Sequence, residues 1–83
     1  MQDTETMAVI NRFWQAYDHL REINERGWQT EFIKKVGSNE GHFLRLKRER
    51  ERMFPVQNIV VIVRDYKVDP MWLLLGRGEM FRI

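Results

Sequence analysis

Apolar residues recur every three or four positions along much of this 83-residue chain, which is the spacing of one face of an α-helix. The first such stretch begins at Thr4 or Thr6 and reaches about Asn24. Its apolar positions are Met7, Ile10, Phe13, Trp14, Tyr17 and Leu20. We predict one long helix here, and Gly27 is a plausible stop for it.

Aromatic residues crowd the middle of this first helix, at Phe13, Trp14 and Tyr17. Exposed aromatic side chains can stack on nucleic-acid bases, so a base-stacking platform is one interpretation. The same residues lie on the apolar side of the helix, and aromatic side chains at this spacing more often form a hydrophobic core. We therefore predict that these rings are buried.

Two shorter helices are predicted next, on either side of a glycine. The second runs from about Gln29 to Val36, with Phe32 and Ile33 on its apolar face, and Gly37 ends it. Ser38 and Asn39 are favourable cap residues for a third helix over 39–48, whose inward residues are Phe43, Leu46 and Leu44. Two short helices that meet at a glycine predict a helix-turn-helix motif.

The fourth apolar stretch, from Pro55 to Tyr66, is rich in β-branched residues and is also compatible with a buried strand. We predict a helix for three reasons. Pro55 suits a first helical position, polar residues such as Asn58 and Arg64 interrupt the apolar run, and no partner strand is visible.

A fifth, short helix is predicted where Asp69 precedes Pro70, because aspartate caps a helix start and proline suits the first turn. We expect one buried turn, with Trp72 as its anchor, before the glycine stop. The apolar residues of that turn are Trp72, Leu73 and Leu75, and the glycines are Gly76 and Gly78. The chain is then an all-α domain of five helices.

Length and composition indicate a single domain over residues 1–83. The tail from about residue 79 is interpreted as a linker, a small strand for dimer pairing, or the natural end. The chain has no cysteine, which fits a reducing compartment, and we expect a cytoplasmic protein. Its longest apolar run, 59–63, is far too short to span a membrane, and no secretion signal is visible.

Basic residues are concentrated in the second half of the chain. Residues 1–41 have five Lys and Arg against seven Asp and Glu, net −2, whereas residues 42–83 have nine against five, net +4. The run 45–52 alone has five basic and two acidic residues. This run either forms a solvated helix face with i,i+3 and i,i+4 ion pairs, or attracts a polyanion such as DNA.

The spacing Gln29-x-x-Phe32-x-x-x-Val36-Gly37, followed by Phe43 and Leu46, resembles the core signature of phage-repressor-type (Cro/repressor, XRE-like) helix-turn-helix domains. The ending from Pro55 to Glu79, with its Trp-Leu-Leu and Gly-x-Gly-Glu, resembles the end of the same family. The resemblance covers about residues 20 to 80. It implies a five-helix, lambda-repressor-like fold that binds duplex DNA as a homodimer, with a helix-turn-helix at helices 2 and 3.

The resemblance also implies which residues contact DNA. The base-contacting positions are Asn39, Glu40, Gly41 and Arg45, and Gln29 matches a phosphate-contacting position. Arginine can donate two hydrogen bonds to guanine, asparagine can pair with adenine, and glutamate can accept from cytosine. The basic residues at the end of the helix are interpreted as further phosphate contacts: Lys47, Arg48, Arg50 and Arg52. His42 is interpreted as solvent-facing, with a phosphate contact as the alternative.

The alternative function is a protein-interaction or antirepressor-type helical module that has lost DNA binding. It is favoured by Ile33 and Ser38, where the family usually has a small and an apolar residue, by acidic Glu40, and by the modest net charge of +2. We predict no enzyme, because His19 and His42 lack a third metal ligand at a supporting spacing and no phosphate-binding loop follows a strand. No cofactor, metal or small-molecule substrate is expected.

Overall fold

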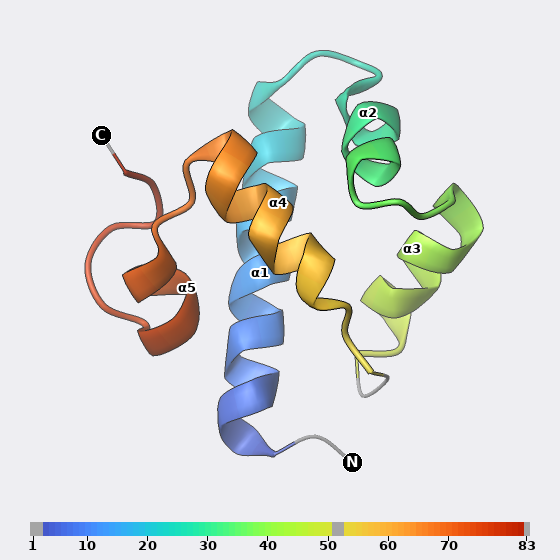
Figure 1. Ribbon diagram of the computed structural model, residues 1–83. Coiled ribbons are helices and arrows are strands. Elements are labelled where there is room, and N and C mark those ends of the chain that lie inside the picture. Colours follow the sequence, from blue (N-terminus) through green and yellow to red (C-terminus); the bar gives the residue numbers. More distant parts are fainter. Residues whose placement is uncertain (1–2, 51–52, 83) are drawn as a thin grey trace.

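The computed structural model describes residues 3–50 and 53–82, and its secondary structure is helical (Figure 1). Within these ranges there are five helices and no strand beyond one isolated bridge. The helices are α1 (Thr4–Ile23), α2 (Trp28–Lys35), α3 (Glu40–Arg48), α4 (Val56–Tyr66) and α5 (Pro70–Leu75). The predicted all-α class is confirmed, and α4 is a helix rather than a strand.

Helix α1 begins where Asp3 accepts a hydrogen bond from the backbone N–H of Thr6 at 2.7 Å. It ends at Asn24, whose backbone N–H and side-chain amide both donate to the carbonyl oxygen of Leu20, at 3.1 and 2.7 Å. The prediction that Gly27 stops this helix was wrong. Gly27 instead caps the start of α2 in a left-handed conformation, with φ of 100°. The side-chain amide of Asn24 satisfies the terminal carbonyl of Leu20, so α1 does not need a glycine at its end.

The turn between α2 and α3 is closed by main-chain hydrogen bonds around Gly37, which has φ of 73°. The N–H of Gly37 donates to the carbonyl of Lys34 at 3.0 Å, and the N–H of Ser38 donates to that of Ile33 at 3.1 Å. This pair of bonds is the Schellman arrangement, which ends a helix sharply at a left-handed residue. The chain then enters α3 with Asn39 as the cap.

Helix α5 starts as predicted, with Asp69 accepting from the N–H groups of Met71 at 2.8 Å and Trp72 at 3.3 Å. The prediction of its buried face was partly wrong. Leu73 is fully buried, whereas Trp72 is half-buried and Leu75 is 58% exposed. Leu73 is therefore the residue that anchors this helix in the core.

The far end of α5 is held by a side chain from α1. Arg12 donates from Nε to the carbonyl oxygen of Leu73 at 2.8 Å and from Nη2 to that of Leu74 at 3.1 Å. A cation beside the last carbonyl groups of a helix also complements the helix dipole. Gly76, with φ of 71°, then ends α5. The first and last helices are thus joined by polar as well as apolar contacts.

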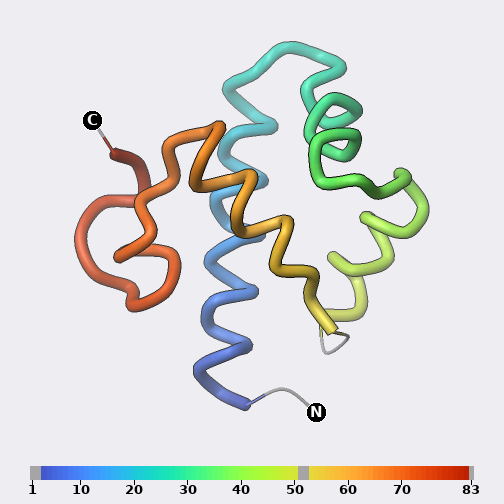
Figure 2. Tube along the Cα trace, viewed as in Figure 1, coloured from blue at the N-terminus to red at the C-terminus, as the bar shows by residue number. Residues whose placement is uncertain are grey.

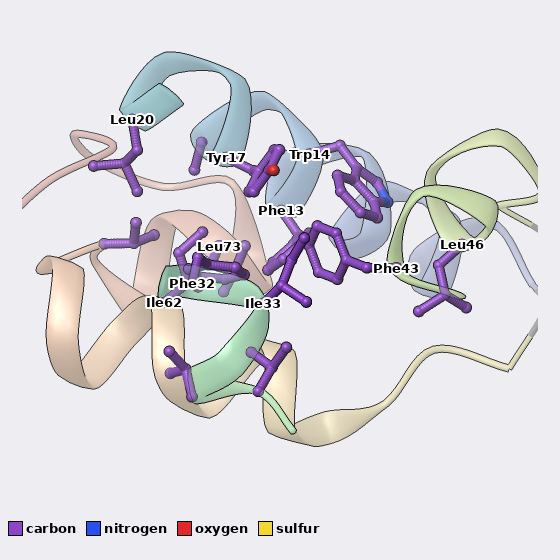
Figure 3. Packing of buried hydrophobic residues seen from close by; sticks show 14 of the residues in the cluster. Phe13, Trp14, Tyr17, Leu20, Phe32, Ile33, Phe43, Leu46, Ile62 and Leu73 are labelled. Atoms are coloured by element: carbon purple, nitrogen blue, oxygen red, sulfur yellow. The ribbon is translucent and has the colours of Figure 1, made fainter. Parts of the chain in front are cut away.

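Aromatic side chains form the centre of the core (Figure 3). Phe13, Trp14 and Tyr17 of α1 are fully buried, which confirms that they are core residues rather than an exposed stacking platform. The Phe32 ring lies among rings of all four of the longer helices. Its ring centroid is 5.3 to 6.2 Å from those of Phe13, Tyr17, Trp28, Phe43 and Tyr66.

The tail folds back onto the segment between α4 and α5. Val68 and Phe81 form an isolated antiparallel bridge. The N–H of Asp69 donates to the carbonyl of Met80, and the N–H of Arg82 donates to that of Lys67, both at 2.8 Å. The backbone of this tail therefore pairs within its own chain. No helix in the described ranges is long and apolar enough to cross a membrane.

Burial of Tyr17 predicts a pH dependence of stability. Burial raises the pKa of its phenol to about 12, and within the described residues its hydroxyl has no hydrogen-bond partner. Between pH 10 and 12 the unfolded chain releases this proton while the folded chain keeps it, so stability falls as pH rises through this window. The loss attributable to Tyr17 is expected to reach about 2 kcal/mol near pH 11.5.

The measurement is chemical denaturation of the wild type and of Tyr17→Phe between pH 8 and 11.5. The stability difference between the two proteins should shift in favour of the variant by that amount. A difference that stays constant with pH would show that the phenol titrates normally in the folded state.

Candidate nucleic-acid interface

Helix α3 has one buried and one exposed face. Phe43 is fully buried and Leu46 is 5% exposed, and both side chains are part of the core (Figure 3). The residues on the other side are exposed to solvent: Glu40, Gly41, His42, Arg45, Arg48 and the following Glu49. The fold therefore fixes α3 by its apolar side and leaves a polar surface that contains two arginines. We refer to these six residues as the α3 outer face.

Helices α2 and α3 lie on the other side of the α1–α4 pair from α5 and the tail in the trace of Figure 2. Helix α3 is therefore separated from α5 by that pair. The chain leaves α1 through a four-residue loop, passes through α2, and reaches α3 after the turn at Gly37. The position of α3 is consequently determined by its contacts with α1 and α2.

Three predicted base-contacting residues lie at the start of α3. The Oδ1 of Asn39 accepts a hydrogen bond from the N–H of His42 at 2.9 Å, so the helix cap uses this oxygen and Nδ2 is the group left to donate. Glu40 is exposed in the first turn, where the helix dipole stabilises a carboxylate. Gly41 is exposed, and a Cβ placed there would make only an ordinary contact, 3.6 Å from Asn39 Oδ1.

The fourth predicted base-contacting residue, Arg45, projects from the middle of the outer face. Its Nε lies 3.1 Å from Oε2 of Glu49, one helical turn further on. This is one of the i,i+4 ion pairs expected if the basic run is a solvated helix face. Arg48, by contrast, has no hydrogen bond or ion pair among the described residues. The two arginines of the outer face therefore differ in how firmly they are held.

Two of the predicted phosphate contacts lie against α1 instead of on the outer face. Lys47 Nζ is 2.6 Å from Oδ1 of Asp18, and Arg50 Nη1 donates to Oδ1 of Asn11 at 2.9 Å. Lys47 Nζ also lies within 6 Å of the centroids of the Trp14 and Tyr17 rings. These contacts hold the end of α3 to the first helix, and sequence reasoning did not identify Asp18 or Asn11 as partners.

The remaining predicted phosphate contacts are Gln29 and Arg52. Gln29 is half-buried near the start of α2 and borders an open hollow between α1 and α2. Arg52 lies outside the described residues. The structure thus brings the N-terminal part of α3, Arg45 and Arg48 onto one surface, and it places Gln29, Lys47 and Arg50 elsewhere.

Residues considered for metal binding do not come together. His19 lies beside the ring of Phe81, with centroids 5.4 Å apart, and His42 is on the α3 outer face. Within the described ranges no group of three His, Cys, Asp or Glu side chains is arranged to hold a metal ion. A larger hollow of about 510 Å³ lies at the α1–α2 loop, where it is wide open and is lined by Ile23, Asn24, Glu25, Arg26, Gly27, Trp28 and Glu31.

Comparison of the chain with protein-family models, with curated proteins and with solved structures found no match. The interpretation of the α3 outer face accordingly depends on its own chemistry and geometry. Its cationic groups are guanidinium groups on the exposed face of α3, and that chemistry suits an anionic polymer with hydrogen-bond acceptors along a groove.

Proposed function

We propose that this chain is a phage-repressor-type helix-turn-helix domain that binds duplex DNA sequence-specifically and regulates transcription. In this proposal α2 braces across the phosphate backbone and α3 lies in the major groove. The observation that carries it is the α3 outer face, where Gly41, Arg45 and Arg48 are exposed on a helix whose Phe43 and Leu46 are fixed in the core. Such a helix can present donors to base edges without moving the rest of the fold.

The turn supports the same proposal. Helices of eight and nine residues are joined by a short connection whose bend is set by Gly37 and whose exit is capped by Asn39. A tight, hydrogen-bonded turn of this kind fixes the direction of the second helix relative to the first. That is the requirement for one helix to cross the backbone while the next enters the groove.

The proposed assembly is a homodimer that reads two half-sites about 34–36 Å apart. The aromatic face of α1 is not available as its interface, because Phe13, Trp14 and Tyr17 are buried in the protomer's own core. The tail is paired with residues 67–69 through its main chain, although Met80 and Phe81 remain partly accessible. Sedimentation of the protein with a selected duplex distinguishes two protomers per site from one.

The proposal is tested by gel-shift selection from a random duplex pool, followed by two arginine variants. Arg45→Ala is expected to lose about 1–3 kcal/mol on the selected site and to relax the choice of base at one position. Arg48→Ala is expected to weaken binding to all duplexes alike and to reduce the slope of log affinity against log salt by about one. Arg48 is the matched control, because it is the same residue type on the same face with no partner to orient it.

Each variant is measured on matched and single-mismatch duplexes at two or more salt concentrations. If the selection enriches no sequence, or if both variants bind and discriminate as the wild type does, α3 does not read DNA. The rival function then becomes the better explanation.

Gly41→Ala provides a second, independent test in which stability and binding move in opposite directions. The Cβ has room in the free protein, and alanine favours helix over glycine, so the variant should be more stable by about 0.5–1 kcal/mol. If Gly41 faces the groove floor, the added methyl group should weaken binding to the selected duplex. Thermal melting and gel shift measure the two effects, and a variant that is more stable and binds equally well would place Gly41 away from the DNA.

The rival proposal, a protein-interaction module, is favoured by apolar side chains that the fold leaves in solvent. On α5 these are Met71, Leu74 and Leu75, which are 51%, 48% and 58% exposed. Val56 and Val60 of α4 are 71% and 39% exposed. The α5 surface lies on the other side of the α1–α4 pair from α3 (Figure 2), so charge substitutions on α5 should leave DNA binding intact if the primary proposal holds.

A further inference from the structure

Arg45 is tied to Glu49 through both main chain and side chain. The backbone N–H of Glu49 donates to the carbonyl of Arg45 at 2.8 Å, and Nε of Arg45 lies 3.1 Å from Glu49 Oε2. Both side chains remain accessible, at 55% and 44%. The guanidinium is thus oriented by a neighbour while its outer end still faces solvent.

The contact at Nε determines the direction in which the rest of the Arg45 guanidinium points. The group is planar and its five N–H donors form a fixed fork, so a carboxylate at Nε occupies one edge of the fork and leaves the outer N–H groups of Nη1 and Nη2 facing away from it. Those two terminal nitrogens can form the bidentate pair with guanine O6 and N7. Restricting the side chain before binding also reduces the conformational entropy that recognition would otherwise cost.

Glu49 is not where helix stability alone would place a carboxylate. It is the C-terminal cap residue of α3, and the negative end of a helix dipole disfavours an anion. Near a phosphate backbone the same charge would also repel DNA. The i,i+4 ion pair with Arg45 offsets part of this cost, and it places an acceptor oxygen where it can orient the Arg45 guanidinium.

We propose that Glu49 is a positioning residue that holds the Arg45 guanidinium in the orientation required to select guanine. This inference rests on the proposed function and extends it to the specificity of the same surface. In this inference Glu49 improves discrimination between base pairs and lowers the affinity for duplex DNA of any sequence. Arg48, which has no such partner among the described residues, keeps its rotational freedom and suits a phosphate contact.

Two substitutions separate orientation from charge. Glu49→Gln removes the charge but keeps an acceptor oxygen at the same distance along the side chain, whereas Glu49→Ala removes both. Each variant is titrated with the selected duplex and with the duplex in which the base pair read by Arg45 is replaced, at two salt concentrations. Arg45→Ala in the wild-type background identifies that base pair.

Both variants should bind non-specific duplex more tightly than the wild type, because the repulsive charge is gone. Glu49→Ala should lose about tenfold in discrimination at the base pair read by Arg45, within the range of one bidentate contact. Glu49→Gln should retain most of it. Combining Glu49→Ala with Arg45→Ala should cost no more discrimination than Arg45→Ala alone.

The inference is overturned if Glu49→Ala discriminates as the wild type does, if Gln and Ala lose discrimination equally, or if Glu49→Ala lowers discrimination further when Arg45 is already absent. Thermal melting of both variants shows whether α3 itself has been lost. The measurements on the wild type and on Arg45→Ala test the proposed DNA-binding function without the Glu49 variants. A selective wild type that loses selectivity with Arg45 but not with Glu49 therefore refutes only the positioning role.

Discussion

Phe32→Ala is expected to destabilise the fold by about 3–5 kcal/mol, a large share of the stability available to a domain of this size. The side chain is fully buried, and its ring packs against rings from α1, α3 and α4 as well as Trp28 of its own helix. Removing it leaves a cavity where the helices that position α3 meet. Cooperative unfolding, followed by circular dichroism in urea, should weaken or disappear.

A suitable control for this change is Phe81→Ala. Phe81 is only partly buried, and its one described ring contact is with His19, at 5.4 Å between centroids. Its loss should cost about 1–2 kcal/mol. Equal effects of the two substitutions would contradict the conclusion that the core is organised around Phe32.

Leu73→Ala is the second substitution with a large expected effect, and it should lower the free energy of unfolding by about 2–5 kcal/mol. Leu73 is fully buried, and Leu75, two positions later in the same six-residue helix, is 58% exposed. Leu75→Ala should therefore change stability by no more than about 0.5 kcal/mol. The pair is closely matched, because both changes are leucine to alanine and Arg12 contacts the main chain at Leu73, which the substitution retains.

The measurement is the free energy of unfolding from denaturant titration of both variants. A similar loss at the two positions would mean that α5 does not dock through Leu73. Trp72, which the sequence suggested as the anchor, is half-buried, so its substitution should fall between the two leucines.

Both predictions bear on function through the position of α3. Its outer face is useful only if Phe43 and Leu46 remain fixed, and the contacts of Lys47 with Asp18 and of Arg50 with Asn11 hold its end to α1. A core variant should therefore lose specific DNA binding together with folding. A variant of the outer face should lose binding alone, and this difference separates structural from recognition residues.

Features that depend on a few neighbouring residues were predictable from sequence. The start of α5 at Asp69 and Pro70, the end of α2 at Gly37 and the cap of α3 at Asn39 are local, because each depends on hydrogen bonds or backbone angles within about one turn. The burial of the aromatic residues of α1 was predictable for a related reason. Over twenty residues, a helical period defines one apolar face without ambiguity.

The same reasoning explains the errors. Helix α5 has six residues, fewer than two turns, so periodicity could not decide whether Trp72, Leu73 or Leu75 faces the core. Gly27 was suited to end one helix or to begin the next, and the contact of Asn24 with Leu20 decided between them. Tertiary packing selected the buried face of α5, whereas a local side-chain hydrogen bond selected the end of α1.

By itself, the sequence determined that the chain is all-helical, where most of its helices begin and end, and which residues form the start and middle of α3. Only the tertiary structure decided which of the described cations in the basic run are held against α1. Arg45 and Arg48 are exposed, whereas Lys47 and Arg50 contact residues of α1 that are 29 and 39 positions away in sequence. The physical reason is that long, flexible cationic side chains take the orientation of whichever acceptor the fold brings within reach, and that acceptor is not encoded next to them.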